Sequence, residues 1–248
     1  MDPYIFYGVV LPERATLNLH FKTKTALSTR LNSMISSKVD ILLNQIVVWV
    51  DVEEVWNVLH LKHAVAQQIS NYLAMITFLT GYAYEFHLTR VLNRGLEVDQ
   101  VFGIDMPAIA AIRQGIDIET EGVALRELTV GLEGVYIQRC LADLVQAIRH
   151  PGDAAFYCYR AIEALRIHCA VWHNLKGDKA VQWEHFKDFS GCNVDHLKEI
   201  KMGADGPRHG DVLSVAPLDQ SDVLTKAWAL VDGYFARIKP AVRAGAMQ

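Results

Sequence analysis

The residues with the clearest capacity for chemistry stand in the segment ADGPRHGDV, residues 204–212. We expect a loop here, because Gly203 can end the preceding helix and Pro207 stiffens the chain just before Arg208 and His209. An imidazole acting as general acid or base, beside a guanidinium that stabilises a charged phosphorane, suits the cleavage of a phosphodiester. The same pair could instead be structural, by capping helix ends or by pairing with the neighbouring acids.

A second group of polar residues lies in the segment FYCYRAIEALRIHCAVWH. Arg160, Glu163 and Arg166 recur every three residues, and His173 follows Arg166 by seven, which is close to two helical turns. One line along a helix would therefore carry all four side chains, which suits anion binding or proton transfer. A solvated helix face with ordinary ion pairs explains the same pattern.

The chain lacks the motifs of common metal and cofactor sites. Its four cysteines, Cys140, Cys158, Cys169 and Cys192, form no C-x-x-C pair, and we interpret them as buried thiols of a reducing compartment. No H-E-x-x-H, Walker loop, G-x-G-x-x-G or G-x-S-x-G is present. We therefore predict neither a metal site nor a cofactor.

The first hundred residues mix strand patterns with one helical pattern. YIFYGVVL and ATLNLHF predict two strands joined by a turn, and QIVVWVDV predicts a more buried strand. Apolar residues then recur at helical spacing from Val55 to Leu79, with a stop at Gly81, before YAYEFHLTRVL alternates like a strand. Residues 1–105 are predicted to form a small α+β unit of strands around one long helix.

The rest of the chain is helical in pattern. The stretch from Gly103 to Gly122 has spaced glycines and four acids, and residues 106–122 are predicted to connect the two parts. Residues 123–248 carry apolar stripes that predict an all-α bundle of four to five helices. The clearest helix follows Asp153, shorter ones are expected near 180–189 and 194–202, and the last begins near Asp219 to Asp222.

Composition limits the classes of function. The formal net charge is −4 and the pI is near 6.2, so there is no global basic surface for nucleic acid, although a local basic site stays open. The start, MDPYIFYGVVLPER, has an acid and a proline where a signal peptide has lysines. The longest apolar stretch, residues 55–80, is interrupted by polar residues. We therefore expect a cytoplasmic protein with no membrane partner.

The helical half resembles the HEPN superfamily, in particular its Apea-like and MauJ-like members. The resemblance covers roughly residues 123–240 and lies in FYCYRAIEALRIHCA, in the later IKMGADGPRHG, and in a closing amphipathic helix. It implies an up-and-down helical bundle that often dimerises. In active members it implies a metal-independent endoribonuclease with an R-x4-6-H motif, often within toxin or anti-phage systems.

The resemblance implies specific roles for residues of this chain. His209, in RHG, is the first candidate for catalysis and Arg208 the second, although the two are adjacent here. Arg166 and His173 have the family's spacing, with six residues between them, but lie in an earlier helix. Residues that could support the site are Arg160, Glu163, Arg166 and His173.

Two functions from different classes follow. The first is an RNA-binding or RNA-cleaving protein that works without a metal. The second is a non-catalytic interaction or ligand-binding module, with an unidentified protein partner, that uses the bundle for dimerisation. A homodimer is expected in both, with Trp228 and Tyr234 as exposed aromatic candidates for the interface.

Overall fold

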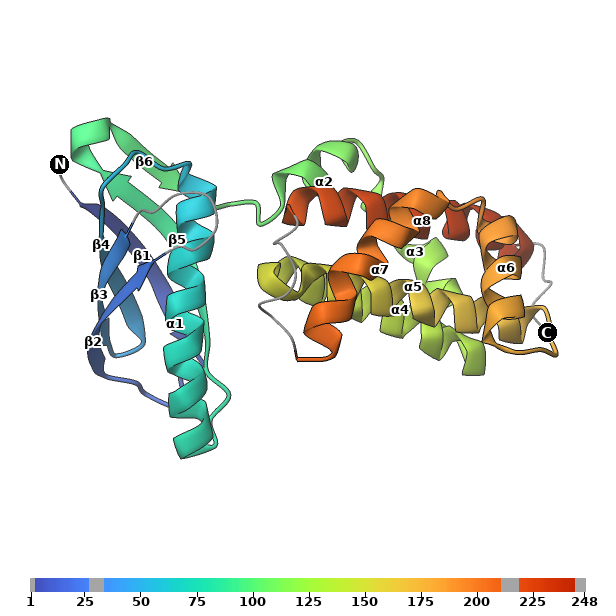
Figure 1. The fold of residues 1–248 in the computed structure, drawn as a ribbon, viewed down its shortest axis with the longest axis horizontal. Helices are drawn as coiled ribbons and strands as arrows, with labels where there is room; N and C mark the ends of the chain where they lie inside the picture. Colours follow the sequence, from blue (N-terminus) through green and yellow to red (C-terminus); the bar gives the residue numbers. More distant parts are fainter. Residues whose placement is uncertain (1–2, 27–33, 211–218, 244–248) are drawn as a thin grey trace. The chain divides into compact units, whose positions relative to one another are not determined.

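The computed structural model describes residues 3–26, 34–210 and 219–243. The chain divides into two units, Met1–Gly103 and Ile104–Gln248. The first unit is an antiparallel sheet with one long helix, and the second is helical (Figure 1). The predicted α+β class, strands first and a helical bundle after them, is confirmed.

The sheet of the first unit has six strands within the described residues, in the order β2-β3-β4-β1-β5-β6. Every neighbouring pair is antiparallel. A short 3₁₀ turn, Arg94–Leu96, joins the last two strands. The strands are β1 (Tyr4–Leu11), β2 (Leu19–Ala26), β3 (Met34–Leu42), β4 (Gln45–Val52), β5 (Glu85–Asn93) and β6 (Val98–Val101).

One face of the sheet is covered by α1 (Val58–Thr80), as Figure 1 shows. Alternate residues of β1 and β4 point toward α1, because side chains alternate between the two faces of a strand. The helix begins at Asn57, whose side chain accepts two backbone hydrogen bonds, and ends at Gly81 with φ 75°. The predicted stop at Gly81 is therefore confirmed.

The strand pairing differs from the prediction in two ways. β1 and β2 do not form a hairpin, since β1 pairs with β4 and β5. β2 starts at Leu19 rather than at Ala15, because the Leu17 amide donates to the Asn44 side chain and holds this segment outside the ladder. β3 was not predicted, because buried Ser37 interrupts the apolar alternation on its inner face.

The second unit contains α2 to α8 within the described residues. The segment predicted as a connection holds α2 and the first turn of α3, and a 3₁₀ turn, Pro151–Asp153, precedes α5. The helices are α2 (Pro107–Ile112), α3 (Ile118–Leu128), α4 (Gly131–Arg149), α5 (Ala154–Trp172), α6 (Lys179–Ser190), α7 (Val194–Arg208) and α8 (Gln220–Arg243).

Helix α5 lies at the centre of this unit and contacts α4, α6, α7 and α8. Cys158, Ile162, Leu165 and Cys169 are fully buried on it, and Cys140 of α4 joins the same core. Burial raises the pKa of the Cys158 thiol to about 12, so this thiol stays protonated at neutral pH. The prediction of buried thiols is confirmed for these three cysteines, whereas Cys192 is half-buried.

Two predictions about the last helices are wrong. Helix α7 does not stop at Gly203 but continues to Arg208, because buried Gly203, Ala204 and Gly206 let it pack closely in the bundle. That packing offsets the glycine penalty of about 1 kcal/mol per residue. Tyr234 is not an exposed aromatic, since α8 buries it completely, and Trp228 is half-buried against the core.

No helix in the described part of the chain combines the length and the apolar character that crossing a bilayer requires.

Candidate functional site

Arg208 and His209 stand at the C-terminal end of α7 rather than in a loop. Arg208 is the last helical residue, and the His209 amide donates to the carbonyl oxygens of Asp205 and Gly206. Both side chains are exposed, and Arg208 forms no ion pair with any described residue. Asp211, which the sequence offered as a neighbouring acid, lies outside the described residues.

The end of α7 lies against the polar side of α5, around the hydroxyl group of Tyr159. Burial raises the pKa of this hydroxyl. The negative charges of Glu163 and Asp205 raise the pKa further, whereas the positive charges of Arg208 and Arg166 lower it. The structure therefore gathers three of the predicted residues, from two helices, around a tyrosine that the sequence analysis did not single out.

Helix α6 adds an aromatic wall to this site. The Trp183 ring stacks on Tyr159 with centroids 6.0 Å apart, and the Arg166 guanidinium lies 5.3 Å from the Trp183 ring centre. The buried Arg166 also donates to the Gln182 side chain, while its Nε atom has no hydrogen-bond partner among the described residues. These contacts hold Arg166 in one orientation.

Glu163 forms an ion pair with Lys179 at the start of α6, with 3.0 Å between Nζ and Oε1. We define the α5–α7 site as Tyr159, Glu163, Arg166, Lys179, Gln182, Trp183, Asp205, Arg208 and His209. It carries three permanent cations against two carboxylates, with a histidine at its margin. Such a surface can hold an anion and supply a titratable imidazole.

Arg160 does not belong to this site. Its Nη2 atom lies 2.9 Å from the buried carboxylate of Asp143 on α4, which also accepts from Arg139. The Arg160 guanidinium additionally lies over the Phe156 ring at 5.1 Å. The predicted single line of four polar side chains is therefore wrong, because α5 has neighbours on several sides and its polar residues face different ones.

His173 also lies apart from the α5–α7 site. Its ring is 4.7 Å from the rings of both His185 and Phe189 on α6. Burial and the neighbouring His185 lower its pKa, so the ring is neutral at physiological pH. The six-residue spacing between Arg166 and His173 therefore does not bring these two side chains into one site.

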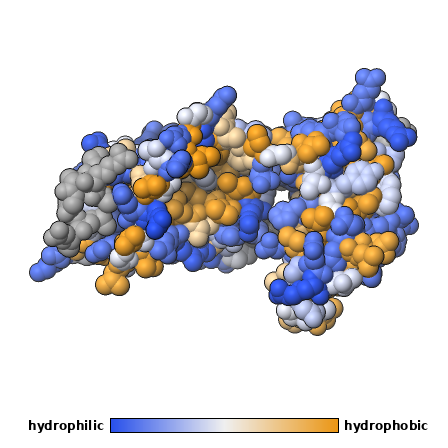
Figure 2. Space-filling view, turned by 180° about the vertical axis from the view of Figure 1, so that it is seen from behind, coloured by the Kyte–Doolittle hydropathy of each residue, from blue (hydrophilic) through white to orange (hydrophobic). Residues whose placement is uncertain are grey.

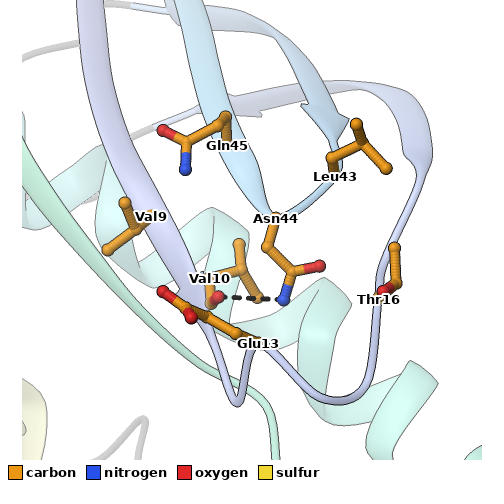
Figure 3. A pocket seen from close by; sticks show the side chains of 7 residues that line it. All are labelled: Val9, Val10, Glu13, Thr16, Leu43, Asn44 and Gln45. Atoms are coloured by element: carbon orange, nitrogen blue, oxygen red, sulfur yellow. Dashed lines mark hydrogen bonds between the residues drawn. The ribbon is translucent and has the colours of Figure 1, made fainter.

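The sheet unit has a shallow pocket at the β3–β4 turn, with Asn44 at its floor (Figure 3). Asn44 has φ 64°, and its Nδ2 atom donates to the carbonyls of Val10 and Pro12. Its Oδ1 atom accepts from the Leu17 amide. Because these hydrogen bonds join the turn to two other segments, we interpret Asn44 as structural.

Sequence reasoning missed Tyr159, Lys179, Gln182 and Trp183. Tyr159 and Trp183 belong to or pack against the core, and only their contacts with charged residues distinguish them from other core aromatics. Lys179 and Gln182 stand near the start of α6, and no motif links that helix to Arg208. The one sequence pattern that pointed to this site was the row of polar residues on α5, and the prediction of supporting residues was based on it.

The fold and these contacts define a two-domain protein, a sheet unit followed by a helical unit with a polar site on it. Residues 4–102 match the N-terminal domain, and residues 123–239 the C-terminal domain, of DUF8168, a family described as a domain of unknown function. The chain therefore belongs to the DUF8168 family. No curated protein and no solved structure matches it. The likeness to the HEPN superfamily and the activity in RNA cleavage stay predictions.

Proposed function

We propose that the helical unit binds RNA at the α5–α7 site and cleaves it without a metal. The observation that carries the proposal is Arg208, which is exposed and without an ion pair among the described residues. Its positive charge, like that of the buried Arg166, lies close enough to the Tyr159 hydroxyl to lower the pKa of that hydroxyl. A free guanidinium holds a phosphate through two parallel hydrogen bonds. The half-buried Trp183, which stacks on the buried Tyr159, supplies aromatic surface of the kind on which bases stack.

In the proposed reaction, the RNA 2′-hydroxyl attacks the adjacent phosphorus and the bond to the 5′-oxygen breaks. His209 takes the proton from the attacking 2′-hydroxyl and gives it to the leaving 5′-oxygen, so the products are a 2′,3′-cyclic phosphate and a 5′-hydroxyl. Arg208 contacts the non-bridging oxygens, where negative charge develops. The imidazole is exposed at the helix end, so it is accessible to a bound strand.

The test is cleavage of a mixed RNA pool in EDTA by wild-type protein, Arg208→Ala and His209→Ala. The chain offers a matched control, because Arg149 and His150 form the same dipeptide at the C-terminal end of α4. We expect activity in the wild type, in Arg149→Ala and in His150→Ala, with at least about a hundredfold loss in the two α7 variants.

Equal activity in all five folded proteins would indicate a contaminant, and inactivity in all five would remove the catalytic part of the proposal. Binding of a fluorescent single-stranded RNA, measured on the same proteins, separates the two parts. Loss of affinity in Arg208→Ala alone would support binding without cleavage.

A second candidate function is a non-catalytic interaction module that forms a homodimer. Arg208 lies in the last turn of α7, where a cation also stabilises the helix dipole, so its placement has a structural explanation. Figure 2 shows apolar side chains gathered on the face of the helical unit turned away in Figure 1. Exposed apolar residues on or beside α3 and α4 are Ile118, Val123, Val130, Leu132 and Val135.

The oligomeric state tests this candidate. Leu132 is 90% exposed, so a dimer formed through this surface should become a monomer in Leu132→Glu with no loss of folding. Light scattering at micromolar concentration measures the mass directly. A wild-type monomer would contradict the dimer.

A further inference from the structure

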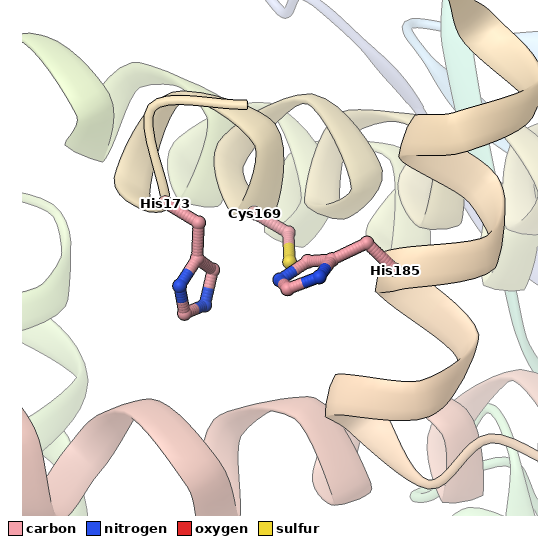
Figure 4. Close-up of side chains that lie close together, drawn as sticks. All are labelled: Cys169, His173 and His185. Carbon is pink, nitrogen blue, oxygen red and sulfur yellow. The ribbon is translucent and has the colours of Figure 1, made fainter. Parts of the chain in front are cut away.

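Three side chains with metal-binding atoms converge between α5 and α6 (Figure 4). Cys169 and His173 are four residues apart at the end of α5, so they lie one above the other on the same side of the helix. His185 approaches from α6. The sulfur of Cys169 and one nitrogen of each histidine all lie within 4.8 Å of one another.

Each of the two histidines has a buried ring nitrogen without a hydrogen-bond partner among the described residues. The Nε2 atoms of His173 and His185 are buried without a hydrogen-bond partner within the described part of the chain. A buried polar group without a partner costs about 1–3 kcal/mol, so two such atoms facing a thiol call for an explanation. Coordination of a metal ion would satisfy both nitrogens.

We propose that Cys169, His173 and His185 bind a Zn²⁺ ion. A thiolate and two imidazoles form a donor set that favours Zn²⁺ over the oxygen-preferring Mg²⁺ and Ca²⁺. In a tetrahedral zinc site, neighbouring ligand atoms are about 3.3–3.6 Å apart, so the side chains need to close by roughly 1 Å. Three protein ligands leave the fourth position open to water or a small ligand.

The surroundings fit a metal site. Burial raises the pKa of the Cys169 thiol to about 11, and the neighbouring Tyr234 hydroxyl partly offsets that rise. A bound metal ion would replace the thiol proton. The Phe189 ring lies beside both imidazoles and limits the access of water. The sequence analysis predicted no metal, because Cys169 and His173 match no metal motif and His185 follows in a separate helix.

A bound ion would fasten α6 to α5. Helix α6 carries Gln182 and Trp183, which orient Arg166, so the metal would stiffen one wall of the α5–α7 site. The zinc proposal is nevertheless independent of RNA cleavage, because cleavage is assayed in EDTA and zinc binding is measured without RNA.

The test is the binding of Zn²⁺ to the full-length protein, freed of metal by EDTA and dialysed, in competition with a chromophoric chelator. We expect one ion per chain and a thermal midpoint that rises with Zn²⁺ and falls again with EDTA. Cys169→Ser, His173→Ala and His185→Ala should each weaken binding at least about tenfold. Cys192→Ser and His150→Ala are matched controls and should bind like the wild type.

Co²⁺ supplies a readout that does not depend on the stability of the variants. The wild-type protein loaded with Co²⁺ should show a thiolate-to-metal charge-transfer band in the near ultraviolet, and Cys192→Ser should keep it. Absence of this band, absence of stoichiometric Zn²⁺ binding, or equal affinity in wild type and all three ligand variants would each overturn the proposal.

Discussion

The two units differ in the kind of buried polar atom that has no partner in the described residues. In the sheet unit these atoms belong to Tyr4, Ser37 and Trp56, whose polar groups are a phenol, an alcohol and an indole. In the helical unit they belong to Gln220 and to five ionisable side chains, Arg166, His168, His173, His185 and His196. Burial lowers the pKa of two of them, His168 and His173. Because enzymes and binding proteins place perturbed ionisable groups at their sites, chemistry is expected in the helical unit.

The largest effect is expected from Gly8→Ala in the sheet unit. A β-carbon at Gly8 would lie 2.0 Å from the backbone oxygen of His87 on β5, so the two strands would have to separate. We expect a loss of about 3–4 kcal/mol in the free energy of unfolding, measured in urea. Gly103→Ala, with nothing within 4 Å of its β-carbon, is the control and should be close to neutral. If the free energy of unfolding of Gly8→Ala equalled that of the wild type, the two strands would separate easily at this position.

The next effect concerns the buried carboxylate of Asp143. The double variant Arg139→Ala and Arg160→Ala leaves this carboxylate without either of its cations. We expect a loss of about 3 kcal/mol in the helical unit, because an uncompensated buried charge is costly. In the sheet unit, removing Arg90 from its exposed ion pair with Asp99 should have a much smaller effect, because solvent screens this pair. Similar losses of stability in the double variant and in the Arg90 variant would contradict the contrast between the two units.

A smaller effect is expected on lowering the pH. His168 is fully buried and hydrogen-bonded to Tyr234, and burial lowers its pKa to about 4 from the ordinary 6.5. As the pH falls, His168 therefore takes up a proton in the unfolded chain before it does so in the folded protein. The contribution of neutral, buried His168 to the free energy of unfolding is fully present above pH 6.5 and is lost as the pH falls toward 4. At about pH 5 the loss should be about 2 kcal/mol.

Urea unfolding in EDTA, followed at several pH values, measures this loss. His168→Phe should remove most of the dependence on pH, because phenylalanine cannot take up a proton. If that variant kept the wild-type slope, another group would be responsible.

The smallest effect is expected from Gly122→Ala on α3. Nothing lies within 4 Å of the added β-carbon, and the position is inside a helix. We expect a gain of about 0.5–1 kcal/mol, because alanine has the higher helix propensity. The thermal midpoint should rise slightly, and a fall would show that this surface of α3 has a contact that alanine disturbs.

Local patterns predicted the elements that depend on near neighbours. YIFYGVVL and QIVVWVDV coincide with β1 and β4, since inward residues of both strands alternate without interruption. The helix predicted after Asp153 is α5. Strand β3 was missed because Ser37 occupies an inward position, and the end of α7 was misplaced because glycine is normally a stop signal.

The candidate site was predictable only in part. Glu163 and Arg166 were predicted to support a site with Arg208, and the structure does place the three residues around Tyr159. Arg160 and His173 were assigned to the same line, yet they face α4 and α6. Spacing along a helix gives the direction of a side chain but not the neighbour it meets.

The sequence by itself determined the α+β class, the long helices and the burial of three cysteines, because hydrophobic periodicity reports on one element at a time. The tertiary structure alone decided the strand order, the length of α7 and the residues that gather at each polar site. These depend on contacts between segments far apart in the chain. The approach of His185 to Cys169 and His173 is the clearest example. These residues stand on two helices, and nothing in the sequence of either helix indicates that the two meet at this point.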